Sequence, residues 1–245
     1  MPDKLYQECR TVISGCRAIF EDLRESGVDF LPVSAETSLV FASSQSGNSD
    51  RNTQREKPSA AETLMEIQQE LVDCCRCSLH EERTHTLIGS GNPNARLVLI
   101  GGTPDSDEDS QGESFVGEAG QLLDRILGAM KLTREEVYIC HLVKCRPVDD
   151  RAPEKSELLS CEAFLKRQLL VIAPEIIISL GDLATRTLLK TDTPVSKLRG
   201  KWQSYEEIPL MATFDPAYLL DQPAGKHQVW EDVKQVIHRL QENSA

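Results

Sequence analysis

Four short runs of branched apolar residues, spread over the C-terminal two thirds of the chain, most constrain its fold. They are RLVLIGG (96–102), VYICHLV (137–143), EIIISLG (175–181) and IPLMATF (208–214). Runs of this kind are typical of parallel strands that are buried on both faces. Segments with helical spacing of apolar residues lie between and after them. This alternation predicts an α/β fold: a three-layer α/β/α sandwich around a short central four-stranded parallel sheet.

The first quarter of the chain has a different pattern. Residues 4–24 carry apolar side chains at helical spacing, which predicts an N-terminal helical extension over 1–33. Ser, Asn and charged residues dominate 34–60, a composition typical of a flexible linker. We therefore expect a helical segment (1–33), a linker (34–60) and a folded domain (61–245). The helical segment suits a contact with another protein, which the sequence does not identify.

The 245 residues carry a net charge of −12, which argues against general, sequence-independent coating of nucleic acid. A local basic groove is compatible with this charge. Two segments qualify, VKCRPVDDR and SKLRGKW, although scattered surface charge explains both more simply. The chain shows no apolar run of membrane-spanning length and no signal-peptide pattern, so we expect a cytoplasmic protein.

Eight cysteines in a chain without an export signal indicate metal or redox chemistry rather than structural disulfides. Cys74 and Cys77 form a C-x-x-C pair, Cys145 ends a predicted strand, and Cys161 lies in a predicted helix. Together they are a plausible four-thiolate site for zinc or an iron–sulfur cluster. Cys161 taken alone is equally well a buried core cysteine, because it has apolar neighbours at helical spacing.

Polar loops follow three of the predicted strands, at 101–120, 141–151 and 213–221. In parallel sheets of this type, ligands bind beyond the carboxyl ends of the strands. The first loop combines dense acidic residues with glycines around a lone Phe115. The loops are therefore expected to converge on one crevice, which the glycine-rich backbone approaches closely.

The region from Cys74 to about Leu240 resembles the family 4 uracil-DNA glycosylases, the iron–sulfur members of that superfamily. The matching stretches are CRCSLHEERT, GSGNPNARLVLIGG, DEDSQGESFVGEAGQLLDRIL, VYICHLVKCRP, SKLRGKW and MATFDPAYLL. The resemblance implies a partner, double-stranded DNA, from which the enzyme flips one nucleotide into a pocket. It also implies a structural 4Fe–4S cluster, held by Cys74, Cys77, Cys145 and Cys161.

The same resemblance implies roles for further residues. Phe115 matches the aromatic residue on which the flipped base stacks, and the rest of the base pocket comprises Gly102, Thr103 and Glu108. The turn PAYLL matches the loop that enters the duplex, with Leu219 as the wedge. The expected DNA-binding residues are Lys144, Arg146, Arg199, Lys201, Tyr218 and Leu219.

The chain departs from that family at the main polar contacts to the base. The family motif Gly-Glu-Ala-Pro-Gly reads GGTPD at 101–105, so Gly102 replaces a glutamate and Asp105 adds a carboxylate. The family's asparagine is His141, and its catalytic histidine is Asp215. We expect Asp105, His141 and Asp215 to be the catalytic residues. Alternatively, Asp105 is a turn acid and Asp215 a helix-capping acid.

Removal of a side chain at Gly102, together with new carboxylates, favours a bulky, amino-bearing pyrimidine over uracil. We therefore expect a DNA glycosylase for a modified base, such as glucosylated 5-hydroxymethylcytosine in phage DNA. Its abasic products would serve antiviral defence. Two alternatives stay open: a weak or unusual uracil-DNA glycosylase of base-excision repair, and a non-catalytic module that binds DNA or a partner protein.

Overall fold

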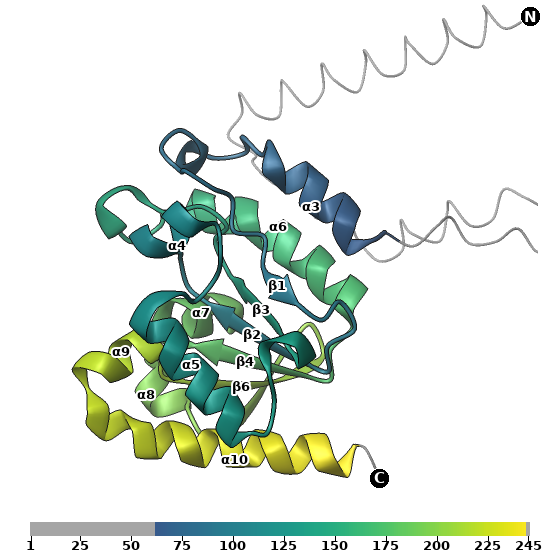
Figure 1. Cartoon of the computed structure of the whole chain (residues 1–245), viewed down its shortest axis with the longest axis vertical. Coiled ribbons are helices and arrows are strands. Elements are labelled where there is room, and N and C mark those ends of the chain that lie inside the picture. The colour runs from purple at the N-terminus through teal and green to yellow at the C-terminus, as the bar shows by residue number, and fades with distance from the viewer. Residues whose placement is uncertain (1–61, 244–245) are drawn as a thin grey trace, which may run out of the picture. The chain divides into compact units, whose positions relative to one another are not determined.

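The computed structural model describes residues 62–243 (Figure 1). The segments predicted as an N-terminal helical extension (1–33) and a linker (34–60) lie outside the described residues. Within the described part, the helices are too short or too polar to cross a membrane.

The described chain forms a six-stranded sheet in the order β1-β3-β2-β4-β6-β5. Its central strands, all parallel, are β3 (Tyr138–His141), β2 (Leu97–Gly101), β4 (Ile176–Leu180) and β6 (Ile208–Thr213). These are the four strands that the apolar runs predict. The edge strands β1 (Ser90–Gly91) and β5 (Trp202–Tyr205) pair antiparallel and were not predicted. Strand β1 is only two residues long and β5 is only partly buried, so neither produces an apolar run in the sequence.

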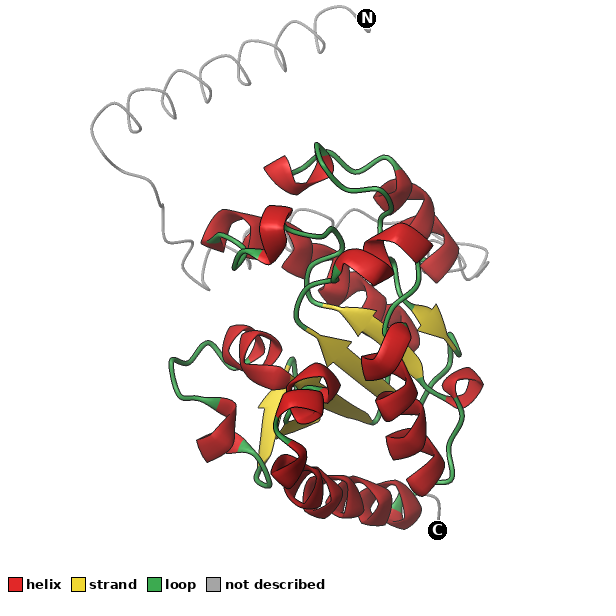
Figure 2. Ribbon diagram, turned by 60° about the vertical axis from the view of Figure 1, so that its left-hand side comes forward, coloured by secondary structure: helices red, strands yellow, loops and turns green. Residues whose placement is uncertain are grey.

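Helices cover both faces of the sheet, which confirms the three-layer prediction (Figures 1 and 2). The helices that share one core are α3 (Leu64–Val72), α6 (Lys155–Ile172) and α7 (Gly181–Leu188). The second core contains side chains of α5 (Gly117–Ala129), α9 (Pro216–Asp221) and α10 (Lys226–Glu242). Strand β2 serves both cores, since alternate side chains point to opposite faces: Val98 and Ile100 to the first, Leu97 and Leu99 to the second.

Shorter elements occupy the connections between these layers. They are α4 (Ser106–Gln111), α8 (Val195–Leu198) and the 3-10 turns η1 (Ser78–His80), η2 (Arg134–Glu136), η3 (Val148–Asp150) and η4 (Pro223–Gly225). Because β2 has β3 on one side and β4 on the other, the chain reverses its direction of winding at this strand. The loops that leave such a point diverge and open a crevice at the carboxyl ends of the strands.

A buried ion pair fastens α10 to the end of β6. Asp232 is fully buried, and its carboxylate accepts bonds from Arg199 Nε at 3.0 Å and Nη2 at 2.6 Å. The hydroxyl of Thr213, the last residue of β6, donates to the same carboxylate at 2.6 Å. This group of three side chains fixes the strand end from which the next loop departs.

We expect Asp232→Ala to lower the free energy of unfolding by about 3–5 kcal/mol, because it leaves a largely buried guanidinium without its partner. Denaturant titration followed by circular dichroism measures this loss. Asp192→Ala is the matched control: it breaks the exposed Asp192–Arg186 pair and should have no measurable effect. Similar losses in both variants would contradict a special role for the buried pair.

Candidate functional site

A cavity of about 280 Å³ lies at the carboxyl ends of the four parallel strands. The loops after β2, β4 and β6 line it, together with the end of β3. All seven residues predicted to be catalytic or to form the base pocket line this cavity: Gly102, Thr103, Asp105, Glu108, Phe115, His141 and Asp215. The structure therefore brings the predicted site residues together in one place.

The acidic stretch after β2 forms the short helix α4, and Asp105 is the residue that caps its N-terminus. The backbone N–H groups of Asp107 and Glu108 both donate to Asp105 Oδ1, at 2.9 Å. In return, the N–H of Asp105 donates to Glu108 Oε2 at 2.8 Å, which completes a capping box. One oxygen of Asp105 thus stabilises the helix start, as the turn-acid alternative requires, while the side chain also lines the cavity.

Glu108 is a buried carboxylate that organises the cavity wall. Its Oε1 accepts bonds from the backbone N–H of Phe115 and from His141 Nε2, the latter at 2.9 Å. Burial alone raises the pKa of Glu108, but the His141 bond and charge and two backbone N–H groups lower it, so the net shift is downward. Glu108 is therefore ionised at neutral pH, and His141 carries a proton on Nε2.

Phe115 and His141 stack on each other, with ring centroids 4.8 Å apart and an interplanar angle of 12°. Phe115 is 4% exposed, and its backbone φ of 55° lies in the left-handed region, a conformation that costs about 1–3 kcal/mol. Bonds to Glu108 and from Arg134 Nη2 (2.6 Å to the Phe115 carbonyl) hold it there. His141 thus covers one face of the ring on which the flipped base is expected to stack.

Gly101 permits this stack. A Cβ at Gly101 would lie 2.6 Å from His141 Nδ1 and 2.7 Å from Phe115 Cζ, so any larger residue would push the rings away. His141 Nδ1 itself is buried and has no hydrogen-bond partner in the described part of the chain. Glu108 bonds to the other ring nitrogen, Nε2, and therefore does not fix whether Nδ1 carries a proton.

The sequence predicts open space at Gly102, and the structure corrects this expectation. A Cβ at Gly102 would lie 3.1 Å from Leu183 Cδ2, so a leucine of α7 fills part of the space that a glutamate would use. Gly181, Asp182 and Leu183 also line the cavity. This wall was not predicted from the sequence, although ligands are expected beyond the carboxyl end of β4 as they are beyond those of the other strands.

Asp215 begins α9 and accepts a bond from the Ala217 N–H at 2.8 Å, the helix-capping role that was the alternative prediction. Burial raises the pKa of Asp215 to about 6, and the charges of Glu108 and Asp105 add to the rise. The Ala217 N–H and His141 act in the opposite direction. Asp215 therefore caps a helix and also changes charge near neutral pH.

Two residues predicted to bind DNA are buried, which corrects their assignment. Lys144 is fully buried and donates to the His141 carbonyl oxygen at 2.7 Å. Leu219 is also fully buried, because it points from α9 into the second core. Its neighbour Tyr218 is 48% exposed and packs against Phe214, so Tyr218 is the large apolar side chain that α9 presents to solvent.

The other three predicted DNA-binding residues differ in how free they are. Arg199 is engaged with Asp232 inside the fold. Arg146 forms a pair with Asp150 at the surface, at 2.8 Å, and Lys201 is exposed. Of the predicted set, Arg146, Lys201 and Tyr218 are thus placed where a partner could reach them.

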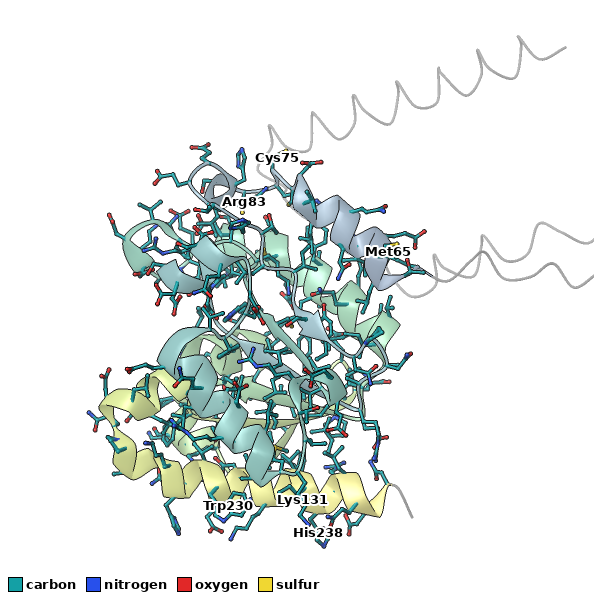
Figure 3. The ribbon with its side chains drawn as sticks, in the orientation of Figure 1. Met65, Cys75, Arg83, Lys131, Trp230 and His238 are labelled. Atoms are coloured by element: carbon teal, nitrogen blue, oxygen red, sulfur yellow. The ribbon has the colours of Figure 1, made fainter. Side chains whose placement is uncertain are left out.

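The four predicted metal-binding cysteines gather at the first core: Cys145 and Cys161 are buried in it, and Cys74 and Cys77 pack against it. Burial raises the pKa of Cys145 to about 11; the Arg83 bond, from Nη1 to Sγ at 3.2 Å, lowers it, and the thiols of Cys161 and Cys77 raise it. Cys77 and Cys74 likewise raise the pKa of Cys161. The thiols therefore form one group beside the loop that carries Arg83, labelled in Figure 3. Burial of Cys161 in the first core fits the core-cysteine alternative as well.

In the described part of the chain, three or more His, Cys, Asp or Glu side chains nowhere stand at the separations of a single-ion site. A tetrahedral zinc site gathers its ligands around one ion, whereas an iron–sulfur cluster spreads its thiolates over several iron atoms. Thiolates are the donors that an iron–sulfur cluster requires, so the chemistry of the four side chains fits this group.

A parallel sheet with an aromatic-lined cavity at its strand ends and a cysteine group nearby is the arrangement that the resemblance to DNA glycosylases implies. The family model for the uracil DNA glycosylase superfamily matches residues 88–234. The chain belongs to this superfamily, which confirms the family predicted from the motifs.

Similar proteins within the superfamily are type-4 uracil-DNA glycosylases. The chain is 36% identical over 183 residues to that of Archaeoglobus fulgidus, covering 71% of this chain and 92% of the relative. It is 40% identical over 164 residues to that of Thermotoga maritima, covering 65% and 84%. A type-5 uracil-DNA glycosylase of Pyrobaculum aerophilum is 30% identical over 146 residues, covering 53% and 64%. At the level of the family, the prediction of a DNA N-glycosylase is confirmed.

The raised pKa of Asp215 predicts a pH-dependent effect on stability. A carboxyl group whose folded pKa is about 6 stabilises the fold while protonated, and this contribution is lost as the pH rises through about 6. Asn caps helices about as well as Asp and stays neutral. Asp215→Asn should therefore match the wild type at about pH 4 and exceed its free energy of unfolding at about pH 7.5. Urea titrations at both pH values test this; an equal difference at both would contradict it.

Proposed function

We propose that this protein is a DNA glycosylase that flips a modified, amino-bearing pyrimidine out of the duplex and hydrolyses its bond to the sugar. The favoured substrate is a modified cytosine, such as glucosylated 5-hydroxymethylcytosine in phage DNA. The observation that carries the proposal is the charge of the cavity. Among the described residues, 62–243, its lining contains no Lys or Arg, one histidine, and the four acids Asp105, Glu108, Asp182 and Asp215.

An acidic cavity suits cytosine better than uracil. Uracil presents two carbonyl oxygens, and both require hydrogen-bond donors. Cytosine presents an amino group in place of one oxygen, and a carboxylate accepts its hydrogen bonds. Asp105 Oδ1 accepts two backbone N–H groups at the start of α4. We therefore assign the other oxygen, Oδ2, as the acceptor for that amino group.

His141 and Asp215 supply the remaining roles in the proposed reaction. Because Nε2 donates to Glu108, a protonated His141 offers Nδ1–H to the oxygen of the leaving base and stabilises its charge. Asp215, as a carboxylate, orients the attacking water or stabilises the cationic sugar. Its pKa of about 6 keeps this group mostly ionised at neutral pH.

A second groove gives room for a bulky substituent on the base. This groove, of about 820 Å³, shares Asp182 and Leu183 with the base cavity, so Leu183 stands between the two spaces. Its other walls, from α6, α7 and the loop after α7, carry Glu162, Arg186, Thr187, Lys190, Thr191 and Asp192. Charged and hydroxyl side chains of this kind hydrogen-bond to sugar hydroxyls, which supports a glucosylated base.

The proposal includes a 4Fe–4S cluster held by Cys74, Cys77, Cys145 and Cys161, whose contribution is to clamp the loops on which these residues lie. The gathering of the four cysteines in and against the first core supports this assignment. The protein would act in the cytoplasm, where removal of bases from modified phage genomes serves antiviral defence. The segment 1–33 would contact a partner protein through the linker 34–60.

The deciding experiment exposes DNA with unmodified, hydroxymethylated or glucosylated cytosine, and uracil-containing DNA, to the purified protein. Strand breaks after cleavage of abasic sites are the readout. We expect breaks in DNA with modified cytosine and their loss in Phe115→Ala. Breaks in uracil DNA alone would contradict the proposal and favour the alternative to which the relatives' names point, a uracil-DNA glycosylase. Binding without any breaks would identify a non-catalytic module.

The groove predicts a selective variant. Thr187 lines the groove but not the base cavity, so Thr187→Trp should lower excision of the glucosylated base about ten-fold and spare that of the hydroxymethylated base. Excision rates on the two DNAs measure this. Leu170→Trp, on the exposed side of α6 outside both spaces, is the matched control. An equal loss on both DNAs would mean that the groove does not receive the substituent.

A further inference from the structure

Lys144 is a buried cation without a carboxylate partner among the described residues. Its side chain is fully buried, and its ammonium group donates to the His141 carbonyl oxygen at 2.7 Å. Within residues 62–243, no carboxylate forms an ion pair with it. A buried ammonium without a counter-ion costs several kcal/mol, so a negative charge beside Lys144 would stabilise its charged form in the fold.

The cysteine group is the source of negative charge that we assign to Lys144. Cys145 follows Lys144 in the chain, and Cys140, Cys145 and Cys161 are buried in the same core, with Cys74 and Cys77 packed against it. Thiolates in this group would supply the charge that the ammonium group lacks. Arg83 adds a second cation, with its Nη1 on Cys145 Sγ at 3.2 Å.

One carboxylate near the cysteines does not serve as the partner of Lys144. Glu157 is buried and acts on Cys77, but it already accepts two bonds from Arg151, at 2.9 and 2.7 Å, and one from Ser78 at 2.8 Å. Its charge is thus matched within α6 and the preceding loop. Within residues 62–243, neither Lys144 nor Arg83 forms an ion pair with a carboxylate, so an anionic group held by the thiols would balance both charges.

We propose that Lys144 is a positioning residue that joins the cysteine group to the base cavity. Its ammonium group is the counter-ion of a thiolate-held cluster, and its hydrogen bond fixes the carbonyl of His141 at the cavity wall. The inference rests on the cluster assignment in the proposed function, and not on the identity of the base. Thiolate ligands give such a cluster the negative charge that Lys144 lacks.

A physical consequence follows for the cavity. When the cluster is bound, Lys144 is neutralised and stays buried beneath His141. When the cluster is lost, the uncompensated ammonium either loses its proton or moves toward water, and both changes weaken its bond to the His141 carbonyl. The occupancy of the cysteine group therefore determines how firmly the ring that covers Phe115 is held.

The test measures how fast the purified holoprotein loses its visible iron–sulfur absorbance to an iron chelator. Lys144→Met removes both charge and donor, whereas Lys144→Gln keeps a donor for the His141 carbonyl. We expect both variants to lose the cluster about 10–100-fold faster than the wild type, the usual effect of removing an outer-shell partner. Lys226→Met, an exposed lysine at the start of α10, is the control and should behave as the wild type.

Wild-type behaviour of Lys144→Gln would overturn the counter-ion role, because the hydrogen bond alone would then suffice. An unchanged rate in Lys144→Met would overturn the proposal altogether. If Lys144→Met does not fold, Arg83→Gln tests the same charge requirement at the surface of the group and should also accelerate cluster loss. Wild-type protein without iron–sulfur absorbance would overturn this inference but leave the base-excision proposal standing, since that proposal is judged by strand breaks.

Discussion

The carboxylate of Glu108 is the constraint on which the cavity depends. It accepts the N–H of Asp105 at the start of α4, the N–H of Phe115 in its left-handed conformation, and Nε2 of His141. One buried side chain therefore fixes a helix start, a strained aromatic residue and the tautomer of a histidine. Burial strengthens these hydrogen bonds and raises the free-energy cost of breaking them, so the three groups are held in one arrangement.

The short segment 141–145 connects the base cavity to the cysteine group. At its first residue, His141 faces the cavity and the Phe115 ring, and at its last, Cys145 faces the thiol group. Lys144 lies between them without a carboxylate partner in the described part of the chain. A charge held by the thiols would therefore act through Lys144 on the His141 carbonyl, to which the ammonium group donates.

The positions at which the chain departs from the family motif also have structural roles, which limit their chemistry. Asp105 and Asp215 both cap helices, and Gly102 faces Leu183 rather than open solvent. An acid that already accepts a backbone N–H is held in one orientation, which is what a recognition or catalytic group needs. The capping and the functional interpretations are thus compatible for the same residue.

The sequence by itself determined the four parallel strands, the helical layers, the family, and seven of the residues that line the cavity. The strands and layers follow from local periodicity, and the convergence of the loops follows from strand ends that share one edge of a sheet. The family and the pocket residues follow from the resemblance of the motifs. Only the tertiary structure decided that Leu219 and Lys144 are buried, that Leu183 occupies the space beside Gly102, and that His141 stacks on Phe115. Such facts depend on which faces of separate elements pack together, and the chain order does not encode them locally.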